Sequence, residues 1–285
     1  MYKIVLKKIL NPTVTLLEIE APFVARKAEA GQFIILRAEE DGERIPLTVA
    51  GYDRVRGTVT VIFQTVGATT LALSRLNEGD SIPDFVGPLG RATDLEGLGE
   101  VCIVGGGVGC AIALPIARAL KDRGCKVTGI IGFRNKGLVI LEDEFKDACE
   151  ELNVMTDDGS FGESGNVCLP LERILKEGKK FDRIITIGPL VMMKFVTETA
   201  RKYGIPCEVS MNPIMIDGTG MCGGCRLTLI EDGRRVVKFA CVDGPDFDGY
   251  KVDFDEAISR LGMYQGFESH AYEEKCNLIK KGGEQ

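Results

Sequence analysis

The chain has 285 residues, of which 45% are hydrophobic and 27% charged, and its net charge is -7 at neutral pH. This length predicts two or three domains, because a single ordinary core rarely grows that large, and the composition is that of a soluble globular protein. The negative charge argues against nucleic acid as a partner, and no apolar run reaches the ~20 residues that span a bilayer. With one histidine and no tryptophan, the chain is poorly suited to histidine-dependent catalysis, so redox chemistry would need a cofactor.

Residues 1–97 are predicted to form an antiparallel β-barrel. Short runs rich in β-branched residues alternate with Gly, Pro and Asp turns at regular spacing, which is typical of a small barrel or sandwich. The N-terminal run alternates and carries three lysines, so it predicts a first strand of a cytoplasmic protein and not a signal peptide. The expected strands cover residues 2–10, 13–20, 32–37, 47–52 and 58–65, with one helical piece at 69–76.

Two places in this barrel carry groups that bind phosphate. In R-I-P-L-T, Arg44 supplies a guanidinium at the start of a strand and Thr48 a hydroxyl that can hydrogen-bond a ring edge. In V-G-A-T-T-L, Gly67 permits close backbone approach, while Thr69 and Thr70 open a helix whose N-terminus attracts phosphate. Taken alone, the first is usually a solvated charge, and the second is just as easily an ordinary N-cap. Their occurrence in one barrel strengthens both interpretations.

From residue 100 the pattern changes to alternating strands and helices. An apolar run at 101–104 ends in G-G-G-V-G, Gly105 to Gly109, and helical periodicity follows at 110–121, where Pro115 is expected to delay or kink the helix. A glycine-rich turn between a strand and a helix is where a dinucleotide pyrophosphate binds, although this turn is not a strict G-x-G-x-x-G. Further strands at 126–132, 153–156 and 183–187, with helices at 142–151, 171–176 and 190–203, predict a doubly wound α/β unit with a parallel sheet.

Three loops follow the carboxyl ends of these strands, where ligands bind in such sheets. They read G-F-R-N-K (132–136), T-D-D-G-S-F-G (156–162) and I-G-P (187–189). In the first loop, Arg134 and Lys136 are cations suited to a 2′-phosphate, which favours NADPH over NADH.

A glycine-rich loop near the C-terminus carries grouped cysteines. Cys222 and Cys225 form C-x-x-C, and Cys241 lies across an expected hairpin. Asp217 occupies the first position of the C-x4-C-x2-C spacing of plant-type 2Fe–2S sites, so we expect a 2Fe–2S cluster held by Asp217 and the three cysteines. The remaining cysteines are scattered among apolar residues and are expected mostly to be buried hydrophobes, namely Cys102, Cys110, Cys125, Cys149, Cys168, Cys207 and Cys276.

Other readings of this loop stay open. A structural zinc site would use its three cysteines with a fourth such as Cys207. A thioredoxin-like C-x-x-C is less well supported, because it would open a helix after a strand. A cofactor-free scaffold is the third alternative. After the loop, residues 253–261 predict an amphipathic helix, and the charged remainder to residue 285 is either a partner-docking helix or a frayed tail.

In this order of features the chain resembles the ferredoxin–NADP reductase superfamily over residues 1–210. Including the cysteine loop, it resembles the branch with a C-terminal 2Fe–2S module, which holds dihydroorotate dehydrogenase electron-transfer subunits and the small subunits of sulfide dehydrogenase and of NADH-dependent reduced ferredoxin:NADP+ oxidoreductase. The matching positions are Arg44, Pro46, Leu47 and Thr48 in the flavin motif, Gly67, Thr69 and Thr70 in a second FAD phosphate loop, Gly105, Gly106, Gly107 and Gly109 in the nucleotide loop, Asp157, Asp158, Gly159 and Ser160 in the T-D-D-G-S element, and Gly188 and Pro189 in C-G-P.

The resemblance implies an FAD-binding barrel at 1–97, an NAD(P)-binding α/β domain at 98–212 and a 2Fe–2S module with a C-terminal helix or tail at 213–285. Thr48 is then the catalytic residue beside the flavin ring, and Arg134 a nucleotide-binding residue. Hydride would pass between NAD(H), with NADP(H) as the other choice, and FAD, and single electrons between FAD and the cluster. The partner would be a larger glutamate-synthase-like flavoprotein subunit with its own iron–sulfur clusters.

Two positions depart from the family pattern. Ile187 stands where the family often has cysteine. Asp217 stands where dihydroorotate-type subunits usually have cysteine, which favours the electron-bifurcating ferredoxin:NADP+ oxidoreductase. A dihydroorotate dehydrogenase electron-transfer subunit is the alternative, and a zinc-stabilised scaffold subunit is the alternative from another class.

Overall fold

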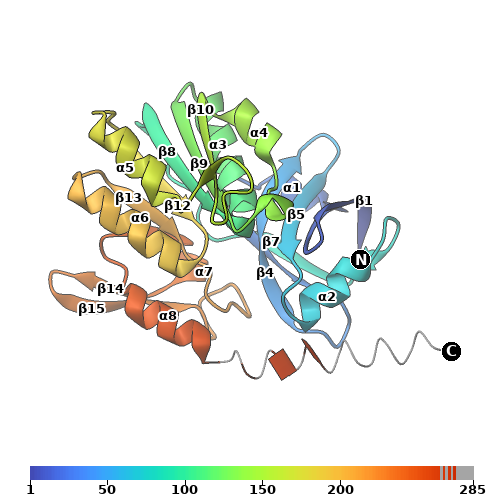
Figure 1. Ribbon diagram of the computed structural model, residues 1–285. Coiled ribbons are helices and arrows are strands. Elements are labelled where there is room, and N and C mark those ends of the chain that lie inside the picture. Colours follow the sequence, from blue (N-terminus) through green and yellow to red (C-terminus); the bar gives the residue numbers. More distant parts are fainter. Residues whose placement is uncertain (264–265, 267–268, 271, 274–285) are drawn as a thin grey trace.

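The computed structural model describes residues 1–263, 266, 269, 270, 272 and 273, and its strands form two seven-stranded sheets and one hairpin (Figure 1). The expectations for the tail beyond these residues lie outside the described chain. Within the described chain, none of the helices has the length and apolar character needed to cross a membrane.

The first sheet is antiparallel and curls into a nearly closed barrel, as the sequence predicts. Its strand order is β6-β1-β2-β5-β4-β3-β7. Large apolar side chains such as Leu17, Ile34 and Phe63 fill its interior and are almost fully buried. The short strands β6 and β7 were not anticipated. The elements of this part are β1 (Tyr2–Asn11), β2 (Val14–Glu20), α1 (Pro22–Ala25), β3 (Phe33–Arg37), β4 (Arg44–Asp53), β5 (Thr58–Gln64), α2 (Ala68–Arg75), β6 (Ser81–Ile82) and β7 (Asp84–Leu89).

The second sheet has the order β11-β10-β9-β8-β12-β13-β16 and is parallel except for the edge strand β16. Its strands are β8 (Glu100–Gly106), β9 (Lys126–Phe133), β10 (Glu151–Thr156), β11 (Glu163–Ser164), β12 (Arg183–Ile187), β13 (Cys207–Ser210) and β16 (Asp246–Asp248). The antiparallel hairpin consists of β14 (Arg226–Glu231) and β15 (Arg234–Phe239). Strands β13 and β16 were not predicted from the sequence, because each is short and contains no long apolar run.

Helices cover both faces of the second sheet (Figure 1), which confirms the doubly wound fold. Successive strand residues point to opposite faces, so Ile103 packs towards α3 and α4 while Val104 packs towards α5 and α6. The helical elements are η1 (Gly107–Gly109), α3 (Cys110–Asp122), η2 (Lys136–Leu138), α4 (Glu142–Ala148), α5 (Cys168–Lys176), α6 (Leu190–Lys202), α7 (Ala240–Asp243) and α8 (Phe254–Gly262).

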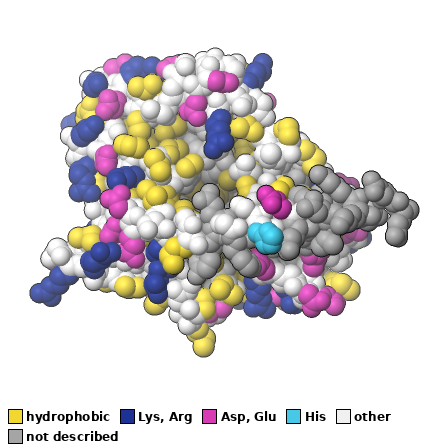
Figure 2. Space-filling model, turned by 60° about the horizontal axis from the view of Figure 1, so that its bottom comes forward, with side chains coloured by type: hydrophobic (Ala, Val, Ile, Leu, Met, Phe, Trp, Pro, Cys, Tyr) yellow, Lys and Arg dark blue, Asp and Glu magenta, His cyan; other side chains and the backbone are white. Residues whose placement is uncertain are grey.

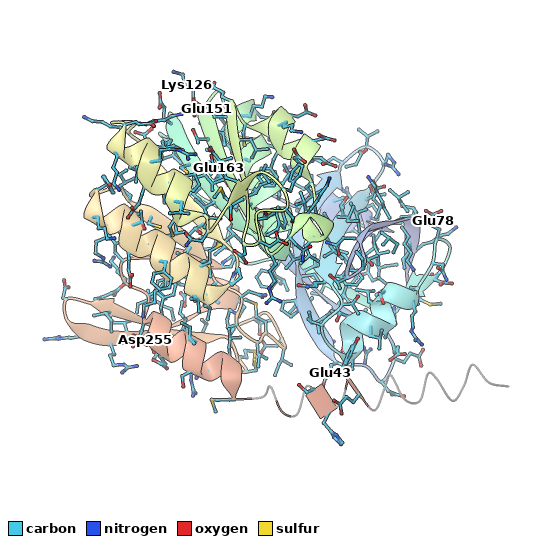
Figure 3. The ribbon with its side chains drawn as sticks, viewed as in Figure 1. Glu43, Glu78, Lys126, Glu151, Glu163 and Asp255 are labelled. Atoms are coloured by element: carbon cyan, nitrogen blue, oxygen red, sulfur yellow. The ribbon has the colours of Figure 1, made fainter. Side chains whose placement is uncertain are left out.

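Two local predictions in this region were wrong. The helix expected at 142–151 ends at Ala148, because Cys149 is extended and the Glu150 amide already donates to the Val127 carbonyl of the sheet. Pro115 does not delay α3, which begins at Cys110 directly after the 3-10 turn and continues through the proline. Helix α8 occupies nearly its expected range, and a salt bridge of 2.7 Å joins its Asp255 (Figure 3) to Lys194 of α6.

A group of polar contacts, here called the polar joint, connects Thr93 and Asp94, which lie between β7 and β8, to Arg183, Glu208 and Asp246 of the second sheet. The Thr93 hydroxyl donates to Asp246 Oδ2 at 2.6 Å, and Arg183 donates both to the Asp94 carbonyl and to Glu208 Oε2. Within the described chain, Glu208 Oε1 and Asp246 Oδ1 are buried and have no hydrogen-bond donor. Burial, together with the negative charge of Asp246, raises the pKa of Glu208 to about 7.

We predict that Glu208 makes the protein less stable as the pH rises from about 4.5 to 7. Glutamate ionises near pH 4.5 in the unfolded chain, and Glu208 ionises near pH 7 in the folded protein. The folded state therefore binds the proton more tightly, and this contribution to the free energy of unfolding is lost as the pH rises through the folded pKa. One pKa unit corresponds to about 1.4 kcal/mol, so the change is about 3 kcal/mol. In urea unfolding between pH 5 and 8, the free energy of unfolding of Glu208→Gln should therefore change less with pH than that of the wild-type protein. The control is Glu43→Gln, at an exposed carboxylate on the barrel surface (Figure 3); a wild-type slope in Glu208→Gln would contradict the prediction.

Candidate functional site

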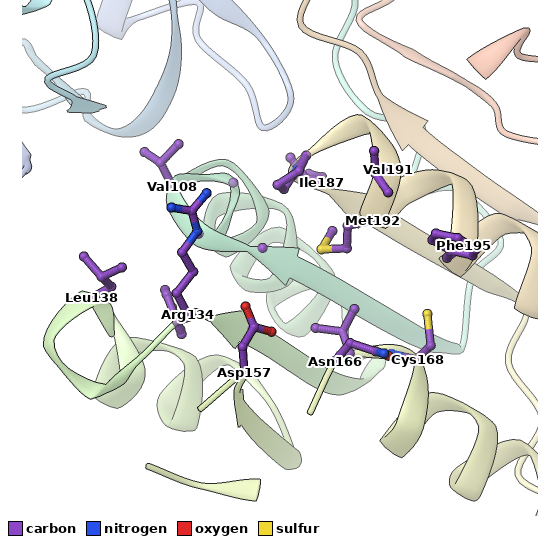
Figure 4. Close-up of a pocket in the computed structure, with 18 of the residues that line it drawn as sticks. Val108, Arg134, Leu138, Asp157, Asn166, Cys168, Ile187, Val191, Met192 and Phe195 are labelled. Atoms are coloured by element: carbon purple, nitrogen blue, oxygen red, sulfur yellow. The ribbon is translucent and has the colours of Figure 1, made fainter. Parts of the chain in front are cut away.

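A cavity of about 1070 Å³ opens at the carboxyl ends of the parallel strands (Figure 4). It lies where strand order reverses: β8 continues to β9 on one side and has β12 as its neighbour on the other. Such a switch point leaves a crevice between the loops that follow the two strands. Accordingly, the cavity is lined by residues of both loops, which are Gly106, Gly107, Gly109, Gly188 and Pro189.

The loop after β8 has no room for side chains at two of these positions. A Cβ on Gly109 would lie 2.4 Å from the Ile187 carbonyl oxygen, and one on Gly106 would lie 2.3 Å from the Met192 sulfur. Gly107 has a φ of 55°, which favours glycine. Helix α3 begins immediately afterwards, and the N-terminus of a helix suits a pyrophosphate. Gly105 does not line the cavity; a Cβ there would meet the Cys110 sulfur at 2.9 Å.

The loops after β9 and β10 contribute one cation and one anion to the cavity. Arg134 and Asp157 line it and lie near one another in Figure 4. Lys136 lies outside the lining, with its ammonium over the Phe161 ring. Asp158 and Gly159 also lie outside and shape the turn; the Ser160 hydroxyl and amide hydrogen-bond the Asp158 carboxylate and lower its pKa.

Sequence reasoning missed the wall that faces these loops. Met192 and Phe195 of α6, with Asn166 and Cys168 at the start of α5, are directed to the cavity (Figure 4). Cys168, which the sequence places among the apolar cysteines, is only half-buried, and this partial burial raises the pKa of its thiol. No sequence motif marks these residues, because they reach the cavity from helix faces that only tertiary packing orients.

A second cavity of about 260 Å³ lies against the barrel. Pro46, Leu47 and Thr48 of β4 line it together with Thr70 of α2, so four of the predicted flavin-binding residues come together. The others lie outside the lining. Arg44 pairs with Asp84 at 2.8 Å, Thr69 is buried, and Gly67 is the N-cap of α2, its amide donating to the Thr70 hydroxyl.

The two cavities share part of their walls. Both cavities are lined by Gln64 and Val66 at the end of β5, Val108 and Ile112 around the start of α3, and the pair Ser210 and Asn212. A ring held in the small cavity would therefore lie next to a ligand in the large one. This proximity is what direct hydride transfer between two bound cofactors requires.

The predicted cluster donors form two pairs, with three donors in the cysteine loop (residues 211–225) and the fourth, Cys241, in α7. The Cys225 and Cys241 sulfurs are buried and 3.1 Å apart. Asp217 Oδ2 accepts from the Cys222 amide at 2.8 Å and Oδ1 from the Thr219 amide at 2.9 Å. These amides, that of Thr219 foremost, lower the pKa of Asp217.

This donor set fits a two-iron cluster in its chemistry. Within the described chain, no three Cys, His, Asp or Glu side chains converge on a single ion site, but the donors of a two-iron cluster need not meet at one point. Cys207, the candidate fourth ligand for zinc, lies in β13 with its sulfur against the Thr197 hydroxyl and joins no such three-donor group among the described residues. Burial raises the pKa of Cys241 to about 12, so metal loading must displace its proton.

Apolar side chains surround the exposed end of the cysteine loop. Ile216 and Met221 are exposed and flank the exposed Cys222, and Val242 is exposed beside Cys241. Figure 2 shows that hydrophobic side chains gather over part of one face of the molecule. Exposed patches of this kind often mark sites of protein association.

Comparison with known proteins gives matches over nearly the whole chain. Residues 212–253 match the iron–sulfur cluster binding domain of dihydroorotate dehydrogenase B. A homolog of the dihydroorotate dehydrogenase B (NAD(+)) electron transfer subunit from Thermotoga maritima is 47% identical over 266 residues, or 93% of this chain and 91% of the relative. The corresponding electron transfer subunit of Streptococcus pneumoniae is 34% identical, covering 86% and 94% of the two chains.

Solved structures agree with these matches. A chain from the structure of the NADH-dependent reduced ferredoxin–NADP oxidoreductase, studied for flavin-based electron bifurcation, has a TM-score of 0.89 and 45% identity, covering 96% of this chain and 97% of that one. Phthalate dioxygenase reductase has a TM-score of 0.59 at 17% identity, covering 84% of this chain and 76% of its own, and shows the likeness of fold alone.

We predict that Asp217 is a cluster ligand and not only a cap of the cysteine loop. Asp217→Asn keeps a carbonyl oxygen for the backbone amides but removes the anionic donor, so the iron content should fall or the visible spectrum should change. Asp217→Cys should load fully with a shifted spectrum, because a thiolate replaces the carboxylate. Asp232→Asn, in the exposed turn of the hairpin, is the control. A wild-type iron content and spectrum in Asp217→Asn would rule the ligand role out.

We also predict that Asp157 disfavours nucleotides that carry a 2′-phosphate. Its carboxylate lines the large cavity, and Lys136 does not. Removing one unfavourable charge contact in a solvated cavity changes the binding free energy by about 1 kcal/mol, which corresponds to about a fivefold change in affinity. Asp157→Asn should shift the preference towards NADPH by that factor in flavin-bleaching rates, while Lys136→Ala should leave it unchanged. An unaltered NADH-to-NADPH ratio in Asp157→Asn would contradict the prediction.

Proposed function

The chain belongs to the family of dihydroorotate dehydrogenase B electron-transfer subunits, and from that premise we propose that it moves electrons between a nicotinamide nucleotide and a partner subunit. Members of this family are NAD(P)H-dependent flavin oxidoreductase subunits, and the cofactors that go with the fold are FAD, a 2Fe–2S cluster and NAD(H). The match of residues 212–253 to an iron–sulfur cluster binding domain supports the cluster.

We assign each cofactor to residues of this chain. The small cavity, with Pro46, Leu47, Thr48 and Thr70, suits the flavin, and Thr48 is the residue that would hydrogen-bond its ring. The glycine loop after β8 and the N-terminus of α3 suit the pyrophosphate of NAD(H) in the large cavity. The donors of the cysteine loop, with Cys241, suit the cluster. When bound, the flavin supplies the conversion between two-electron hydride chemistry and one-electron cluster chemistry.

The shared wall of the two cavities is the observation that carries this proposal. Val108 and Ile112 face both cavities, so the chain itself separates the two ligand spaces by little more than side chains. These apolar residues, with Met192 of the large cavity, would limit the access of water to the place where hydride would move. The function rests on this adjacency and not on any single motif.

We further propose that the complex is an electron-bifurcating NADH-dependent reduced ferredoxin:NADP+ oxidoreductase. The likeness to a chain of that enzyme reaches 45% identity over 96% of this chain, while the relatives named for dihydroorotate dehydrogenase B are 47% identical in Thermotoga maritima and 34% in Streptococcus pneumoniae. Identity alone does not separate the two, so the choice rests on Asp217, where dihydroorotate-type subunits usually carry cysteine. The partner would then be a larger glutamate-synthase-like flavoprotein with iron–sulfur clusters. Dihydroorotate oxidation is the alternative, favoured by the match of the cysteine loop.

The complex isolated from the native source should distinguish these activities. We expect a larger flavoprotein to co-purify and the complex to reduce NADP+ only when NADH and reduced ferredoxin are both present, because each supplies one part of the electrons. Mass spectrometry identifies the partner, and chromatographic separation of NADPH from NADH follows the reduction of NADP+, because the two nucleotides absorb equally at 340 nm. Reduction of NAD+ by dihydroorotate in the same preparation would instead assign the chain to pyrimidine synthesis.

A further inference from the structure

The cysteine loop is pressed against the barrel at one glycine. Gly218, the residue after Asp217, has a φ of 74°, and a Cβ there would lie 2.6 Å from Leu89 Cδ1 and 2.9 Å from Ile35 Cδ1. Leu89 ends β7 and Ile35 lies in β3, so both atoms belong to the barrel. The backbone of the loop therefore packs directly against these two barrel side chains, and a methyl group at residue 218 would have to displace their ends.

A second connection holds the other side of the cluster site. The Arg91 amide donates to the Gly244 carbonyl at 2.7 Å, and Arg91 Nε donates to the Val242 carbonyl at 3.0 Å. Both carbonyls lie within three residues of Cys241. Arg91 follows the barrel strand β7 by two residues, so the chain leaving the barrel binds the segment that carries this donor.

The small cavity and the two buried thiols are linked by one hydrophobic cluster. Phe33 and Met215 line that cavity, and both belong to the same buried hydrophobic cluster as Cys225 and Cys241. The position of the cysteine loop on the barrel therefore determines how far the cluster donors lie from a ring bound in the cavity.

We propose that Gly218 is a positioning residue, which fixes the distance between the flavin and the cluster by letting the cysteine loop lie directly on β3 and β7. The inference rests on the proposed function. Single-electron transfer, in which the flavin is oxidised by one electron and the cluster is reduced by one, slows steeply with distance. The loop has no strand or helix of its own between β13 and β14, so the barrel contact and the Arg91 hydrogen bonds supply the rigidity that this distance needs.

The test compares two glycines of the same loop in the full chain loaded with FAD and cluster. Gly223 has a φ of 69°, close to that of Gly218, but a Cβ there would have only Phe239 Cε1 within 4 Å, at 3.9 Å. Gly218→Ala and Gly223→Ala thus carry similar backbone strain, and only the first meets the barrel. After rapid anaerobic mixing with NADH, we expect Gly218→Ala to keep the wild-type rate of flavin bleaching and to slow cluster reduction several-fold, while Gly223→Ala leaves both rates unchanged.

Hydrogen exchange provides a readout that does not depend on activity. Amides of residues 212–225 and 84–91 should exchange faster in Gly218→Ala than in Gly223→Ala. If cluster reduction slows equally in the two variants, strain within the loop is responsible. If Gly218→Ala has wild-type rates of cluster reduction and amide exchange, the contact does not control the distance. Either result overturns the proposal.

A surface variant covers the case in which Gly218→Ala does not retain its cluster. Arg91→Ala should slow cluster reduction and speed amide exchange at 240–246, whereas Arg123→Ala, which removes a hydrogen bond within α3 and its C-terminal cap, should change neither. Unchanged kinetics in Arg91→Ala would then overturn the proposal. A wild-type chain without iron, or with a flavin that NADH does not bleach, would instead refute the proposed function.

Discussion

A single hydrophobic core that joins the barrel, the second sheet and the cysteine loop is the constraint on which this structure depends. Phe33 and Ile35 of the barrel share it with Val196 of α6 and with Cys225 and Cys241. Because apolar burial is the main favourable term in folding, this core stabilises the individual parts and also fixes their mutual positions. The thiols are thus placed by the same contacts that form the wall of the small cavity.

The two cavities follow from topology more than from any particular side chain. The strand order reverses between β8 and β12, and the loops that follow these strands diverge to leave a crevice. The barrel then closes one side of the crevice, with Gln64 and Val66 in the common wall. A sheet with helices on both faces cannot build such a wall by itself, since Pro46, Leu47 and Thr48, which line the small cavity, come from the barrel.

Where the segment after the barrel meets the second sheet, buried polar groups pair with partners that are distant in the sequence. Thr93 meets Asp246, and Arg183 meets both Asp94 and Glu208. Gly31 lies beside this joint, where a Cβ would come within 2.1 Å of the Thr93 hydroxyl oxygen. Buried polar pairs contribute little net stability but specify one arrangement, because any other leaves a buried charge or hydroxyl without a partner. The joint therefore selects one orientation of the two sheets.

The sequence by itself determined the class of fold, because strand and helix periodicities are local and the turn glycines report backbone conformation directly. It also predicted the glycine loop after β8, the β4 residues from Pro46 to Thr48 and the x4 and x2 spacing of the cysteine loop, since each motif lies within a few residues of chain. The limits of the three domains and the roles of the site residues stay predictions. Only the tertiary structure moved Lys136 and Arg44 out of the cavities, brought Cys168 and Phe195 into one, and set Gly218 against Leu89. These outcomes depend on residues distant in sequence meeting across a packed interface, and a local pattern carries no information about which distant surface it will meet.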